Sequence, residues 1–172
     1  MRHKVIRMTL DPESIQNAID EIEKQREWAV NRAKDLAKAL MDEGLEVARM
    51  EFRTAVYDGD NDVTVTASEN GSIYAVVATG FSTLFIEFGT GVTYPDDHPL
   101  MSEFGFERGT YGKGHGKQQF WGYYGEPGTN GVVRDPDRML VITRGNPANQ
   151  SMYKTAKHLE YLLPRLVKEI FV

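Results

Sequence analysis

The sequence predicts an α+β protein, in which a small antiparallel sheet of about four strands packs against a long N-terminal helix and a kinked C-terminal helix. Apolar residues with helical spacing near both ends of the chain predict the two helices. Alternating residues around an Asn-Gly pair predict the sheet between them. A stretch rich in glycine and aromatic residues, at about 89–137, has neither pattern and predicts a long inserted loop.

Length and composition favour one domain over two. The 172 residues fit a single domain spanning 1–172 around one core. The net charge of −5 argues against nucleic-acid binding through general basicity. The chain has no cysteine, which excludes disulfides, thiolate metal sites and cysteine nucleophiles. We expect no signal peptide and no membrane partner, because no apolar run is long enough for either.

The first regular element is a long helix expected from Asp11 to Gly44. Asp11 can cap the first amides, Pro12 suits the first helical position, and Gly44 is the expected stop. Between them, apolar residues recur at steps of three and four, namely Ile15, Ile19, Ile22, Trp28 or Ala29, Ala33, Leu36, Ala37 and Leu40. A helix of about 30 residues is some 45 Å long, so we expect it to extend beyond the sheet and meet a neighbour.

Three strand-like segments follow this helix. Alternation from Leu45 to Tyr57 predicts a half-buried strand. The next two strands are expected at Val63–Ala67 and Ser72–Thr79, because Asn70-Gly71 between them is a strong hairpin signal. Adjacent apolar residues in the segment 81–88 fit either a buried strand or a short helix, and we prefer the short helix.

The inserted loop is marked by its composition. Eleven of the 16 glycines lie between Gly89 and Gly131, interleaved with eight aromatic residues. Disordered segments are poor in aromatic residues, so we expect a loop that a partner orders, with a short hairpin around Phe120 to Tyr124.

Regular structure is expected to resume at Met139. The β-branched run Met139–Thr143 predicts an interior strand. Gly145-Asn146-Pro147-Ala148 predicts a turn, after which Asn146 or Asn149 would cap a final helix. Apolar residues of that helix share one face, and Pro164 should kink the helix or split it in two.

Two loop motifs resemble ligand-binding sequences without matching them. Asp58, Asp60, Asp62 and Glu69 have the spacing of a calcium loop, but Val63 replaces the required glycine, so we favour a solvated turn. The glycine–lysine run 109–117 lacks the spacing and the Ser/Thr of a phosphate-binding loop.

A nucleic-acid-binding module is the main alternative function. It would use the loop 109–125, with basic side chains on phosphates and aromatic rings stacked on bases. The residues concerned are Lys113, His115, Lys117, Phe120, Trp121 and Tyr123. Charges of both signs are balanced between His98 and Arg138, which argues against this alternative.

A hydrolase or metal site is the weakest hypothesis. His98 and His115 could combine with Asp96, Asp97 or Glu87, but their irregular spacing favours exposed loop histidines. Ser82 and Ser102 lack the Gly-x-Ser-x-Gly context of a nucleophile elbow. We therefore assign no catalytic, metal or cofactor-binding residue. Glu87 has two interpretations, as a cap of nearby amides or as one side of an interface pair.

The order of these features resembles the tail-component family of long-tailed bacteriophages, which includes tail-completion or neck proteins made for head–tail joining. The matching residues are Ile86-Glu87-Phe88-Gly89-Thr90-Gly91, then Gly145-Asn146-Pro147-Ala148 and Met152-Tyr153. The resemblance covers most of the chain. It departs from the family at Thr93 to Asp137, where the family often has only a brief loop.

The resemblance implies a non-enzymatic structural protein of a phage or prophage virion, without a cofactor. Its subunits would form a homo-oligomeric ring on assembly, between the head connector or adaptor and the tail tube, and viral DNA would pass through without specific recognition. The location would be the virion neck or tail, and the bacterial host cytoplasm during assembly. The interface residues that we then expect are Glu87, Phe88, Gly89, Thr90, Gly91, Tyr111, Phe120, Trp121, Tyr123 and Tyr124.

Overall fold

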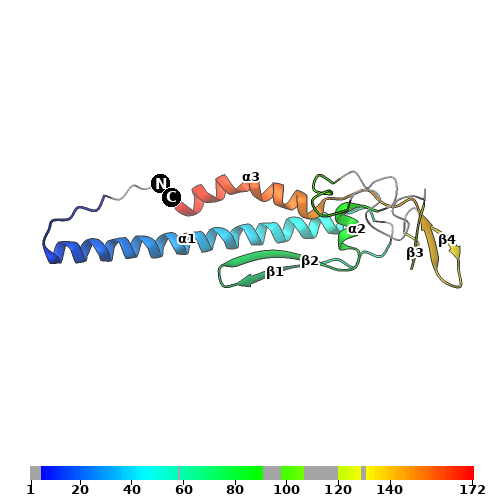
Figure 1. Ribbon diagram of the computed structural model, residues 1–172, viewed down its shortest axis with the longest axis horizontal. Helices are drawn as coiled ribbons and strands as arrows, with labels where there is room; N and C mark the ends of the chain where they lie inside the picture. The colour runs from blue at the N-terminus through cyan, green and yellow to red at the C-terminus, as the bar shows by residue number, and fades with distance from the viewer. Residues whose placement is uncertain (1–4, 58, 91–97, 107–119, 129–130) are drawn as a thin grey trace.

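The computed structural model describes residues 5–57, 59–90, 98–106, 120–128 and 131–172. Figure 1 shows a rod built on one long helix, with a second helix along one side and a β-hairpin along the other. A three-stranded sheet lies at the end of the rod away from the start of the long helix. In chain order the elements are α1 (Pro12–Arg53), β1 (Thr64–Asn70), β2 (Ile73–Thr79), α2 (Thr83–Phe88), β3 (Trp121–Tyr124), β4 (Val132–Asp135), β5 (Leu140–Thr143) and α3 (Ser151–Phe171).

The structure confirms a mixed helix and strand architecture with long N- and C-terminal helices. The prediction of one sheet of four strands is wrong, because the strands form two separate antiparallel sheets of two and three strands.

Helix α1 begins as the sequence predicts and ends nine residues later than the last residue expected, Gly44, at Arg53. The Asp11 carboxylate accepts a hydrogen bond from the Ser14 amide at 2.8 Å, and Pro12 is the first helical residue. The 42 residues make a helix of roughly 63 Å. The predicted strand Leu45–Tyr57 is therefore wrong over most of its length. Its two most buried side chains, Ala48 and Phe52, are four residues apart and fit a helical face as well as they fit alternation.

Gly44 lies inside α1 and does not end it. A glycine is needed here because neighbouring elements pack closely against the helix. A Cβ atom at this position would lie 3.0 Å from Leu159 Cδ1 of α3 and 3.3 Å from Val76 Cγ2 of β2. The missing side chain lets α3 and the hairpin approach α1 at the same point.

The hairpin β1–β2 forms as predicted around Asn70-Gly71. Asn70 pairs with Ile73, and Gly71 has a φ of 63°, a conformation that glycine adopts without strain. Val65 of β1 enters a core made with Ala48, Phe52 and Ile86. The hairpin thus covers the second half of α1, and α2 closes the end of this core.

The small three-stranded sheet has the order β3-β5-β4. Its centre is β5, which confirms the predicted interior strand, and its Val141 side chain is fully buried. Strand β3 pairs with β5, with Tyr124 opposite Leu140, so the predicted local hairpin around Phe120 to Tyr124 is wrong. The segment 89–137 accordingly contains two strands that the sequence did not predict as such.

Helix α3 runs through Pro164 as a single helix, so the alternative of two helices is wrong. It also confirms the predicted apolar face, since Leu162 and Leu166 are buried.

Asp62 ties the start of the hairpin to the start of α2. Its carboxylate accepts hydrogen bonds from the Ser82 hydroxyl at 2.5 Å, the Ser82 amide at 2.9 Å and the Phe81 amide at 2.7 Å. These bonds, with the Ser82 hydroxyl first, lower the pKa of Asp62 from 3.8 to about 2. Asp62 is thus a structural anchor, and Glu69 of the calcium-like spacing lies on β1.

We expect Asp62→Asn to lower the free energy of unfolding at neutral pH. Because the folded-state pKa lies below the unfolded value, the stabilisation by the carboxylate is present above pH 3.8 and is lost as the pH falls towards 2. The stability difference between wild type and variant, measured by urea unfolding, should therefore shrink over this window. Asp60→Asn, at an exposed aspartate two residues away, is the control. A difference that stays constant down to pH 2 would contradict this role of Asp62.

Candidate functional site

The candidate site is the end of α2 together with the turn that follows it. Ile86 is fully buried in the core, and Glu87, Phe88, Gly89 and Thr90 are buried as well. Gly89 follows the helix with a φ of 77°, which turns the chain sharply. The segment that the sequence marks as the centre of the resemblance is therefore internal to the protein.

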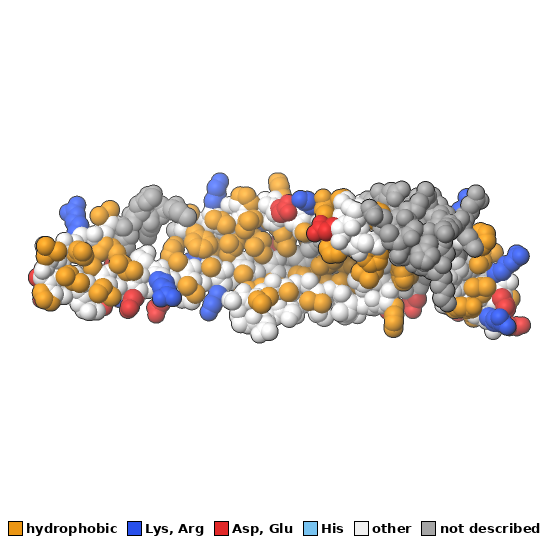
Figure 2. Space-filling model, viewed as in Figure 1, with side chains coloured by type: hydrophobic (Ala, Val, Ile, Leu, Met, Phe, Trp, Pro, Cys, Tyr) orange, Lys and Arg blue, Asp and Glu red, His pale blue; other side chains and the backbone are white. Residues whose placement is uncertain are grey.

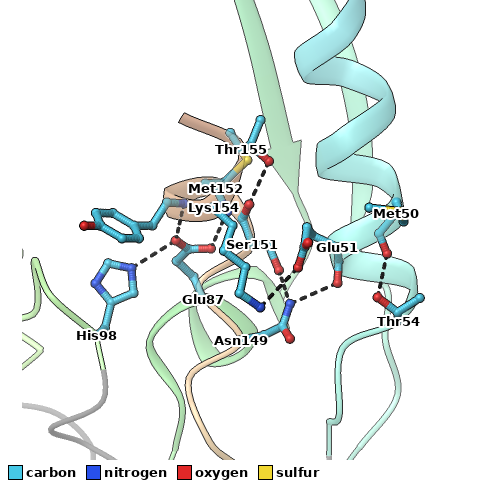
Figure 3. Close-up of polar contacts among 11 residues, drawn as sticks. Met50, Glu51, Thr54, Glu87, His98, Asn149, Ser151, Met152, Lys154 and Thr155 are labelled. Atoms are coloured by element: carbon cyan, nitrogen blue, oxygen red, sulfur yellow. Dashed lines mark hydrogen bonds and ion pairs between the residues drawn. The ribbon is translucent and has the colours of Figure 1, made fainter. Parts of the chain in front are cut away.

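The carboxylate of Glu87 caps the start of α3, as Figure 3 shows. Its Oε2 atom accepts from the Met152 amide at 2.7 Å, and its Oε1 atom accepts from the Tyr153 amide at 3.0 Å. A negative charge here satisfies free amides and faces the positive end of the helix dipole. Of the two interpretations of Glu87, the structure confirms the amide cap.

The predicted caps Asn146 and Asn149 are wrong. The residue before α3 is Gln150, which has a φ of 59° and whose side chain does not cap the helix. The amides of Asn149 and Gln150 instead donate to the carbonyls of Ile86 and Glu87, at 2.8 and 3.1 Å. The chain leading into α3 is thus bound along the end of α2, which brings the Glu87 carboxylate to the helix start.

His98 is the third hydrogen-bond partner of the Glu87 carboxylate. Its Nε2 atom lies 3.0 Å from Glu87 Oε1, and its Nδ1 atom accepts a hydrogen bond from the Leu100 amide at 3.1 Å. Because Nδ1 is an acceptor, the hydrogen of the ring is on Nε2 and is donated to Glu87. His98 is only 5% exposed, so the prediction of an exposed loop histidine is wrong for this residue. Both ring nitrogens are engaged in hydrogen bonds within the chain.

Phe88 packs in an aromatic cluster that includes the His98 ring. Its ring stacks on Phe106, with centroids 4.4 Å apart and planes 11° apart. It also contacts Phe104 and the His98 ring, at 5.7 and 4.4 Å. The cluster holds the segment 98–106 against α2, and Tyr153 of α3 meets the edge of His98 at 5.6 Å.

Gly89 and Thr90 are interlocked with the turn 145–148. The Thr90 amide donates to the Asn146 carbonyl at 2.9 Å, and the Asn146 amide donates to the Thr90 hydroxyl oxygen at 3.2 Å. The Asn146 side-chain amide reaches the Phe85 carbonyl at 3.1 Å. A Cβ atom on Gly89 would lie 2.7 Å from the backbone nitrogen of Ala148, so no side chain fits there. Two of the three sequence motifs that carry the resemblance therefore form one packed unit across 56 residues.

The start of α3 is also fixed to α1. The Asn149 side-chain amide donates to the Glu51 carbonyl at 3.0 Å, and Lys154 Nζ lies 3.2 Å from Glu51 Oε2 (Figure 3). Together with Glu87, these contacts join α1, α2 and α3 at one point. We call this set of contacts around Glu87 the α3 anchor.

The remaining predicted interface residues lie elsewhere or outside the described part of the chain. Phe120 and Tyr124 are exposed, at 55% and 72%, and Tyr123 is half-buried, with its hydroxyl accepting from the Gly128 amide. Trp121 is the first residue of β3. Gly91, Asp96, Asp97, Tyr111, Lys113, His115 and Lys117 fall outside the described residues. Most of the loop 109–125 that the nucleic-acid alternative requires is among them.

A surface depression of about 400 Å³ lies beside the turn at Thr90. Phe81, Tyr123 and Tyr124 line it, and we call these three residues the aromatic face. Thr90 and Ser82 also line the depression, so it adjoins the buried turn. The sequence prediction did not include Phe81, which is 95% exposed. One signal in the sequence could have identified Phe81. It lies directly after the hairpin and belongs neither to the alternating apolar pattern of the strands nor to the helical pattern of the long helices.

No protein-family model matches this chain, and no curated protein or solved structure matches it either.

Two kinds of feature are absent from the described residues. Their His, Asp and Glu side chains form no group of three that could hold a metal ion. Among the same residues, no helix is both long and apolar enough to cross a membrane. What the site does chemically is to fix three helices and a turn with hydrogen bonds, beside an exposed aromatic surface.

Replacing Glu87 tests the α3 anchor. Glu87→Ala leaves two backbone amides and the His98 N–H without their acceptor, so we expect a loss of about 3 kcal/mol in the free energy of unfolding, measured by urea denaturation. Glu87→Gln retains one acceptor oxygen and should lose less. Glu103→Ala, at an exposed glutamate, is the control and should change little. Wild-type stability in Glu87→Ala would refute the anchor.

Two glycines with similar φ values differ in the space around them. Gly89 and Gly105 have φ values of 77° and 73°, but a Cβ atom on Gly105 would meet nothing within 4 Å. Gly105→Ala should cost about 1 kcal/mol of backbone strain, whereas Gly89→Ala should cost about 2 kcal/mol more, because its ψ of 172° suits only glycine and because the new side chain forces the turn 145–148 away. Thermal and urea unfolding of both variants would measure this, and equal losses would contradict the close approach at Gly89.

Proposed function

We propose that this chain is a structural virion protein of a tailed phage or prophage, a tail-completion or neck subunit that forms a ring between the head connector and the tail tube. The support begins with the resemblance of the segments 86–91 and 145–148 to the tail-component family. The contacts of Gly89 and Thr90 with Asn146 add a physical reason why the two motifs occur together in one chain. They form a rigid base, and neither has the exposed polar groups of a catalytic site.

The observation that carries the proposal is the aromatic face beside this base. Phe81 and Tyr124 are 95% and 72% exposed, although large aromatic side chains are usually buried. The backbone at Phe81 is held by its hydrogen bond to Asp62, so the ring is presented from a fixed position. Exposed aromatic side chains on a rigid frame are the anchors that protein interfaces prefer.

The two ends of the rod differ, which suits a ring. A closed ring needs contacts between two different surfaces of each subunit. One end of this chain carries the aromatic face and the three-stranded sheet, and the opposite end of the rod does not (Figure 1). In this function the Glu87 side chain acts indirectly, because it keeps the base in shape and does not itself touch the neighbour.

The test is head–tail joining in a phage that lacks this protein. Wild-type protein added to separate heads and tails should give joined particles, counted by electron microscopy. Phe81→Ser/Tyr124→Ser should reduce their number at least tenfold, because it removes the two exposed aromatic anchors. Ile73→Ser, which removes a 66% exposed apolar residue from the hairpin, is the matched control and should join normally. Efficient joining without this protein would refute the proposal.

A further inference from the structure

In the part of the chain that the structure describes, no helix lies beside the first half of α1. Helix α3 runs along α1 and ends near Trp28, where the ring of Phe171 meets the indole edge-on at 5.9 Å. Residues 12–27 extend beyond this point (Figure 1). The core of the protein lies at the other end of α1, around Ala48 and Phe52.

This half of α1 carries an exposed row of isoleucines, next to Ala18, which the chain itself buries to 6% exposure. Ile15, Ile19 and Ile22 are 38%, 44% and 58% exposed. The preceding residues 5–10 therefore do not cover them. Figure 2 shows hydrophobic side chains gathered over this end of the molecule. The row continues at steps of four and three through position 26 to Ala29 and Ala33, which are also exposed. Alternating steps of four and three are the seven-residue repeat of a coiled-coil seam.

Charge along α1 changes sign within this region. Residues 12–23 contain four acidic and no basic side chains, a net charge of −4. Residues 24–38 contain five basic and two acidic side chains, a net charge of +3. Two such helices side by side in parallel would place like charges together, whereas an antiparallel pair places the acidic segment of each beside the basic segment of the other.

We propose that the first half of α1 pairs with the same segment of a second copy of this chain, as an antiparallel two-helix coiled coil. The seam then places Ile15 opposite Ala33, Ile19 opposite Ala29, and Ile22 opposite Arg26 of the other copy.

Side-chain size favours this register. Each of the two outer isoleucines faces an alanine, so large and small residues interlock across the seam. At the central positions the apolar stem of Arg26 covers the isoleucine of the other copy, and its guanidinium lies beside the other copy's Glu23. A single polar residue in an otherwise apolar seam fixes register and orientation.

This pairing goes beyond the proposed neck function and does not depend on it. An antiparallel pair is two-fold symmetric and closes on itself, whereas a ring uses contacts between different surfaces. The dimer should therefore form with the purified protein alone, without connector or tail components. If head–tail joining fails in the test above, the dimer is unaffected.

Light scattering after gel filtration tests the pairing. The wild-type protein should have twice the chain mass of 19.4 kDa at micromolar concentration. Ile19→Lys/Ile22→Lys should weaken dimerisation at least tenfold and give the monomer mass, with an unchanged circular dichroism spectrum because both positions are exposed. Tyr161→Lys, at an 83% exposed position on α3, is the matched control and should remain dimeric. A monomeric wild type, or a mass that the lysine pair does not change, would overturn the proposal.

Single cysteines test the orientation, since the natural chain contains none. A mixture of Ile22→Cys and Arg26→Cys should form a disulfide-linked dimer under mild oxidation, because these positions face each other, while each variant alone should link much less. Efficient linking of Ile22→Cys with itself would indicate a parallel pair and overturn the antiparallel arrangement. Where the lysine variants misfold, Glu23→Lys and Arg26→Glu replace them: each should weaken the dimer, and the combination should restore it. Failure of the combination to restore it would overturn the register.

Discussion

The arrangement of the helices depends on one buried carboxylate. Glu87 is the acceptor for two amides at the start of α3 and for the N–H of His98, and it lies at the end of a helix whose preceding residue, Ile86, is in the core. A buried carboxylate is tolerated only where hydrogen bonds replace its lost water. Three donors from two distant parts of the chain supply these hydrogen bonds. The Glu87 carboxylate therefore fixes the positions of α2, α3 and the segment 98–106 relative to one another.

Local signals in the sequence were sufficient where local chemistry determines the structure. The cap Asp11, the proline after it and the Asn70-Gly71 turn each specify their own element, and all three were predicted correctly. The same holds for the strand around Val141, whose β-branched neighbours fit a sheet interior. The short helix at 83–88 was also predicted, although periodicity left it undecided.

The failures occur where distant residues override a local signal. Gly44 normally indicates a helix end, but here close packing against Leu159 and Val76 requires it inside a helix. Asn146 and Asn149 normally indicate a helix cap, but Glu87, more than 60 residues earlier in sequence than Met152, takes that role. His98 is buried because Glu87 needs a donor, which its sequence surroundings do not reveal. For the candidate site, the sequence singled out the segment 86–91, but it did not indicate that Glu87 and Phe88 are buried.

The position of Gly44 also bears on the order in which the chain folds. Glycine inside a helix costs about 1 kcal/mol relative to alanine, and helix propagation across it is correspondingly weak. The stretch of α1 that follows gains its helical state from contacts with the hairpin and with α3, which are separated from it in sequence by about 20 and 100 residues. We therefore expect the continuous rod to form late in folding, with the second half of α1 becoming helical together with the core that it helps to build.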